Sequence, residues 1–147
     1  MPHELHTQLF LVTMLFGWGL ALTIGKAAER TVTGILIVGA SLSILALPVS
    51  MAARFQHLEW SAAAVDGLLL AALLGAAHHF KAGWILWMTA FQFMIILSHL
   101  PILFRPLISS ESYVASTALW SWLMMLTLIQ ATGRNWLSRR QTGISRS

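Results

Sequence analysis

Asp66 is the residue of this sequence whose type and position most clearly call for a chemical explanation. It lies five or six residues inside an apolar run that begins near Ser61, a depth of roughly 8 Å if the run is helical and rises about 1.5 Å per residue. An ionised carboxylate at such a depth in a lipid bilayer costs on the order of 3 kcal/mol, and more without a partner. We therefore expect Asp66 to be protonated, paired or in contact with water.

Other polar residues are expected at the same end of the molecule. His99 lies at a similar depth in the next apolar run, and Gln92 precedes it by seven residues, on the same helical face. Arg54 and His57 belong to the polar segment that precedes the Asp66 run. The sequence thus predicts one candidate polar or ligand site made of Asp66, Gln92, His99, His57 and Arg54.

Several kinds of site fit these residues. The simplest is a hydrogen-bonded network that fixes helix register and needs no ligand. A quinone or proton-relay site would use Asp66, Gln92 and His99, because ionisable groups inside a membrane often serve function. A haem or pigment would use His99 as its axial ligand. The sequence specifies none of these cofactors.

A metal site is a further alternative, since neutral imidazoles suit zinc or copper. The available histidines are His3, His6, His57 and His99. Their spacings match no known motif, so the sequence predicts no particular metal.

The composition indicates a membrane protein. The chain has 147 residues, of which 57% are hydrophobic and 10% are charged, whereas soluble domains carry about 25% charged residues. It has no cysteine, which excludes disulfides, thiolate metal sites and cysteine nucleophiles. The net charge of +4 comes without a basic stripe interleaved with aromatic residues, so we expect no nucleic-acid partner.

Five apolar runs are long enough to cross a bilayer, which takes about 20 residues in a helix. They cover residues 6–25, 31–53, 61–78, 82–104 and 113–132. Charged or proline-containing segments separate them, and a re-entrant third run would reduce the count to four. We predict an all-α integral membrane protein, a compact bundle of about five transmembrane helices, with residues 1–133 as one domain and 134–147 as a basic cytoplasmic tail.

The basic residues indicate the orientation. Five spans place the two termini on opposite sides, and seven of the nine Lys and Arg residues then lie on the C-terminal side: Lys26, Arg30, Lys81, Arg134, Arg139, Arg140 and Arg146. Cytoplasmic loops carry the excess of positive charge. The N-terminus is therefore expected outside and the C-terminus in the cytoplasm. Trp84, Trp87 and Trp136 are expected near the cytoplasmic interface, where tryptophan is enriched.

Small residues recur at every fourth position of the third run, at Ala63, Gly67, Ala71 and Gly75. They share one helix face, which would let another backbone approach closely, as membrane helices require. We expect this helix-packing face to meet another helix, either of the same chain or of a partner.

No motif of the sequence supports an enzymatic activity. Short loops, the small-residue face and few embedded polar groups favour a structural or accessory subunit of a larger complex in a prokaryotic inner membrane, packed against lipids and other transmembrane subunits. One alternative is a redox or proton-handling protein with a site near Asp66 and His99. The other is a small oligomeric transporter or channel, although the sequence contains no internal repeat of the kind transporters show.

Overall fold

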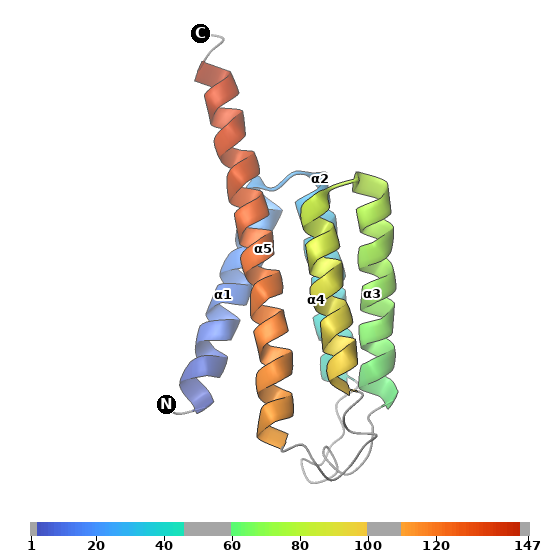
Figure 1. Ribbon diagram of the computed structural model, residues 1–147. Coiled ribbons are helices and arrows are strands. Elements are labelled where there is room, and N and C mark those ends of the chain that lie inside the picture. The colour runs from blue at the N-terminus through green and yellow to red at the C-terminus, as the bar shows by residue number, and fades with distance from the viewer. Residues whose placement is uncertain (1–2, 46–59, 100–109, 145–147) are drawn as a thin grey trace.

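The described residues form five α-helices, which confirms the predicted all-α class. The computed structural model describes residues 3–45, 60–99 and 110–144 (Figure 1). The helices are α1 (His3–Ile24), α2 (Ala27–Leu45), α3 (Trp60–Phe80), α4 (Gly83–His99) and α5 (Ser110–Ile144).

Successive helices run in opposite directions, so the N- and C-termini lie at opposite ends of the bundle (Figure 1). Packing follows the chain from α2 to α5, and α1 lies against both α5 and α2. The third helix is unbroken over its 21 residues and forms one edge of the bundle (Figure 1). The 35 residues of α5 extend past the other helices (Figure 1), so the predicted basic tail is helical as far as Ile144.

Two short turns close the end of the bundle at which α1 and α3 finish. Gly25 and Lys26 join α1 to α2, and the Gly25 N–H still donates to the carbonyl of Ala21 at 3.1 Å. Lys81 and Ala82 join α3 to α4. Lys81 has a φ of 50°, the left-handed conformation that commonly ends a helix, and its N–H donates to the carbonyl of Ala77 at 2.9 Å.

Three helices are long and apolar enough to cross a membrane among the residues that the structure describes. These segments are Leu5–Ile24, Ala27–Leu45 and Ala62–Phe80, and Gly83–Ser98 is a shorter apolar helix. The second helix begins four residues before the predicted start at residue 31 and includes Glu29. The reason is that the Glu29 side chain finds partners inside the fold, as described below.

The bundle exposes apolar side chains on the outside as well as burying them. Val12, Leu15 and Phe16 of α1 are each more than 60% exposed. The buried core lies mainly between α2, α3, α4 and α5, and includes Leu36, Leu73, Ile85, Met88, Met124 and Leu128. A helix that is apolar all round is typical of a membrane span or of a fully buried helix, and these helices are not fully buried.

Hydroxyl side chains obtain hydrogen bonds from their own helices. Thr33 donates to the carbonyl of Glu29 at 2.7 Å, Thr89 to that of Ile85 at 2.9 Å, and Thr132 to that of Leu128 at 2.8 Å. All three threonines are buried. This four-residue back-bonding satisfies a hydroxyl where water is absent, so threonine can be placed in apolar surroundings at little cost.

Gly25 gives a test of the turn between α1 and α2. A Cβ at this position would lie 2.1 Å from the Ala21 carbonyl oxygen and 2.9 Å from the Glu29 Cβ. We expect Gly25→Ala to lower the thermal unfolding midpoint in detergent, because backbone rather than a flexible side chain would have to move.

Gly34→Ala is the matched control. No atom lies within 4 Å of its added Cβ, so the alanine causes no clash. Because alanine favours the helix more than glycine does, the free energy of unfolding should stay unchanged or rise by about 0.5–1 kcal/mol. Equal midpoints for the two variants would contradict this account of the turn.

Candidate functional site

Glu29 is a fully buried carboxyl group at the start of α2. One oxygen, Oε2, accepts a hydrogen bond from the backbone N–H of Lys26 at 2.8 Å. This contact is the acidic half of a capping box, in which the third residue of a helix reaches back to the N-cap. The other oxygen, Oε1, accepts from the Asn135 side-chain amide on α5. Glu29 therefore joins the α1–α2 turn to α5.

Two arginines cap the carbonyl end of α1 beside this carboxyl group. Arg139 of α5 donates to the carbonyl of Ile24 at 2.6 Å, and Arg30 of α2 donates to that of Thr23 at 3.3 Å. The last carbonyls of a helix have no partner in the helix and carry its partial negative charge, so guanidinium groups are favourable there. Three helices are thus connected by polar contacts at one end of the bundle.

Asp66 and Gln92, two residues of the predicted site, are in contact. The Gln92 side-chain amide donates to the Asp66 carboxyl oxygen Oδ1 at 3.0 Å and approaches the Asp66 backbone carbonyl at 3.4 Å. Gln92 is 1% exposed. This pair links α3 to α4, and Gln92 contacts Asp66 although the sequence had placed His99, seven residues further along α4, at the depth of Asp66.

The structure does not describe the side chains of the other predicted site residues. His99 is the last residue of α4, and its side chain lies outside the description. Arg54 and His57 lie outside the described residues. His6 of α1 is exposed. Within residues 3–45, 60–99 and 110–144, no group of three or more His, Cys, Asp or Glu side chains could hold a metal ion.

The small-residue face of α3 points away from the rest of the bundle over part of its length. Ala71 and Gly75 are exposed, whereas Leu73, Ala76 and Ala77 are buried against the neighbouring helices. An added Cβ at Gly67 or Gly75 would meet no atom within 4 Å. Within this chain, α3 therefore packs through the opposite face.

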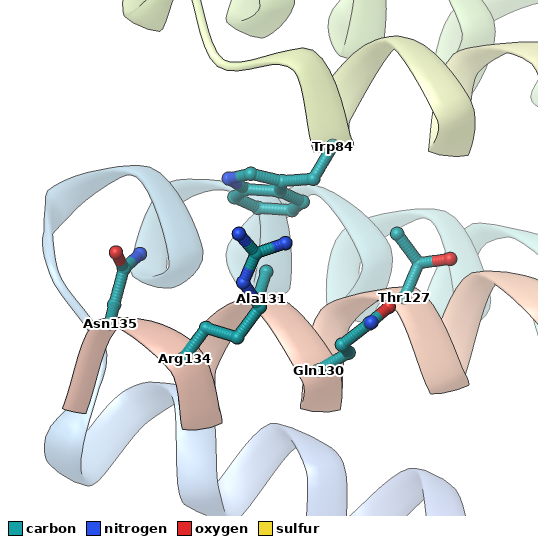
Figure 2. Close-up of a pocket in the computed structure, with 6 residues that line it drawn as sticks. All are labelled: Trp84, Thr127, Gln130, Ala131, Arg134 and Asn135. Atoms are coloured by element: carbon teal, nitrogen blue, oxygen red, sulfur yellow. The ribbon is translucent and has the colours of Figure 1, made fainter. Parts of the chain in front are cut away.

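A pocket lies between α4 and α5 near the end that carries the basic residues. Figure 2 shows the Arg134 side chain extending from α5 to the Trp84 ring of α4, with Gln130 and Thr127 further along α5. One hollow of about 240 Å³ is lined by these four residues with Ala131 and Asn135. An adjoining hollow of about 400 Å³ shares the same four residues and extends along Gly83, Trp87 and Phe91.

Neither Glu29 nor the lining of this pocket was predicted from the sequence as a functional position. Glu29 stands three residues after Lys26, which is the spacing of a helix cap and its returning acid. Thr127, Gln130 and Arg134 follow one another at intervals of three and four residues, so they form a polar stripe on an otherwise apolar helix. Both spacings can be seen in the sequence. The contact of Glu29 with Asn135 and the position of Trp84 over the polar stripe depend instead on how the helices pack.

Comparison of the chain with protein-family models, with curated proteins and with solved structures gives no match.

Glu29 substitutions test the contact between the turn and α5. Glu29→Ala removes the acceptor of two buried donors, and an unsatisfied buried donor costs about 1–3 kcal/mol. We expect a loss of at least this size in the free energy of unfolding, measured with denaturant in detergent micelles. Glu29→Gln should lose less, because one amide oxygen remains and the Asn135 amide can reverse to accept from the new NH₂ group. If Glu29→Gln is as destabilising as Glu29→Ala, the hydrogen bonds are not the source of the effect.

Proposed function

We propose that this chain is a five-span integral membrane protein of a prokaryotic inner membrane, and that it serves as a structural subunit of a larger membrane complex. The observation that carries the subunit proposal is the outward-facing small-residue surface of α3. A bundle edge made of Ala71 and Gly75, with open space over Gly67, offers a partner helix the close backbone approach that stabilises helix pairs in lipid.

The position of α3 supports this function. It forms an edge of the bundle (Figure 1) and is buried on the opposite side by α2 and α4. Leu68, 64% exposed, and Leu74, 50% exposed, are also on the solvent-accessible side of the helix. Small residues let the backbone of another helix approach closely, and a transmembrane helix of a partner subunit is the occupant we propose for this face.

The polar pair within the bundle favours this structural function over a redox or proton-handling one. Gln92 supplies the hydrogen bond that Asp66 needs in apolar surroundings. The contact fixes the register of α3 against α4 and requires neither a quinone nor a haem. An α3 held in this way presents its small-residue face in a constant orientation.

The proposed topology places the basic end of the bundle in the cytoplasm. Because the chain has no cysteine, single cysteines can report on each end. We expect His3→Cys, which precedes the Leu5–Ile24 segment, to react with a membrane-impermeant maleimide in intact cells, and Gln141→Cys to react only after the membrane is opened. Gln141 is exposed. Labelling of Gln141→Cys in intact cells would contradict the orientation, and release of the protein from membranes by alkaline carbonate would contradict membrane insertion.

Enlarging the α3 face tests the subunit function. We expect the chain, extracted in mild detergent and cross-linked in the membrane beforehand, to copurify with another transmembrane protein in stoichiometric amount. The double variant Ala71→Leu, Gly75→Leu should lower the recovery of that protein at least about tenfold, which corresponds to about 1.4 kcal/mol of association free energy.

The matched control adds the same bulk elsewhere. Ala90 of α4 and Ala118 of α5 are also exposed alanines, so Ala90→Leu and Ala118→Leu should leave recovery unchanged. Equal loss in the control, or a chain that is recovered alone after cross-linking, would overturn the subunit proposal.

A further inference from the structure

The pocket between α4 and α5 has the chemistry of a phospholipid site. We propose that it binds the phosphate headgroup of an anionic phospholipid at Arg134, with the start of an acyl chain along Trp87 and Phe91. The inference rests on the proposed membrane insertion, but not on the proposed partner subunit.

Arg134 is the charged group of the pocket. Figure 2 shows its side chain extending from α5 into the space below the Trp84 ring. In the part of the chain that the structure describes, its guanidinium has no hydrogen-bond acceptor or acidic partner. Neighbouring arginines are engaged: Arg139 caps α1, and Arg140 lies 3.8 Å from the centroid of the Trp136 ring. Arg134 is therefore available to an external anion.

A guanidinium is well suited to phosphate, because its planar N–H groups can bind two oxygens at once. The Gln130 amide beside it offers two further donors. The Thr127 hydroxyl already donates to the carbonyl of Leu123 at 2.7 Å, so it presents an acceptor, which suits a hydroxyl of a glycerol headgroup. The polar end of the pocket thus matches a phosphoglycerol group.

The other end of the pocket is aromatic. Trp87 and Phe91 succeed Trp84 along α4 and line the larger hollow. Their rings lie 6.3 Å apart between centroids, and Phe91 stacks on Trp120 of α5 at 6.1 Å. Trp87 is 65% exposed, so this wall continues onto the apolar outer surface. A ligand that fills the whole pocket would therefore carry a phosphate at the Arg134 end and a hydrocarbon chain at the aromatic end.

The surrounding charge selects an anionic lipid over a zwitterionic one. The turn before α4 carries Lys81, and Lys26 and Arg30 lie at the same end of the bundle. The pocket also adjoins the N-terminus of α4, where the helix dipole adds partial positive charge. A choline cation next to these groups would be repelled, whereas phosphatidylglycerol bears only the negative phosphate.

The test measures lipid binding to the full-length protein in neutral detergent by native mass spectrometry. The probes are dioleoylphosphatidylglycerol, dioleoylphosphatidylcholine and inorganic phosphate. We expect the phosphatidylglycerol complex to be at least about tenfold tighter than the phosphatidylcholine complex. Arg134→Gln should weaken phosphatidylglycerol binding at least about tenfold, and Arg134→Lys by an intermediate factor, because an ammonium group does not reproduce the two-point contact.

Arg140→Gln is the control, since it removes the same charge from the same end of α5. Its affinity for phosphatidylglycerol should stay within about twofold of the unchanged protein. Equal weakening by Arg134→Gln and Arg140→Gln, or equal affinity for the two lipids, would overturn the site. Displacement of the lipid by inorganic phosphate at equal concentration would overturn the assignment to a lipid. Lipid binding is measured on the purified protein in detergent, independently of the labelling and copurification experiments. A failure of the proposed topology or subunit function can therefore be distinguished from a failure of the lipid site.

Discussion

The carboxyl group of Glu29 brings together parts of the chain that are far apart in sequence. It accepts hydrogen bonds from the backbone of Lys26 and from the side chain of Asn135, and it is itself fully buried. A buried carboxyl group is stable only when its oxygens are paired. The need to pair both oxygens of Glu29 therefore determines where α2 begins and how α5 lies against the α1–α2 turn.

The rotation of α5 about its axis has consequences for the neighbouring pocket. Glu29 fixes the direction of the Asn135 side chain. Arg134, the residue before it, then points to a different face of α5, since successive side chains differ by about 100° around an α-helix. Arg134 extends toward Trp84 on α4 (Figure 2). The same rotation places Arg139 at the carbonyl end of α1. One end of the bundle is thus internally paired through Glu29, Arg30 and Arg139, while Arg134 remains open to an external anion.

The two surfaces proposed to function differ in their chemistry because the proposed bilayer would make different demands on them. On α3, small residues leave space beside the backbone, and apolar helices gain from close packing rather than from leaving water. Between α4 and α5, polar and aromatic groups follow each other along one pocket, as the boundary between headgroups and hydrocarbon does. The Asp66–Gln92 contact lies between α3 and α4, so it holds the helix with the small-residue face against the helix that forms one wall of the pocket.

The sequence by itself determined the all-α class of the fold, and its five apolar runs correspond to the five helices of the residues that the structure describes. Its long apolar runs have few charges, and a helix is the structure that satisfies every backbone hydrogen bond within one such run. It also predicted that Asp66 needs a partner, but it placed His99 at the matching depth and Gln92 seven residues earlier on the same helical face. Only the tertiary structure decided that Asp66 pairs with Gln92, that Glu29 belongs inside α2, and that Ala71 and Gly75 face outward. Those outcomes depend on the rotation of each helix about its axis, and helices that are apolar all round carry little sequence signal for that rotation.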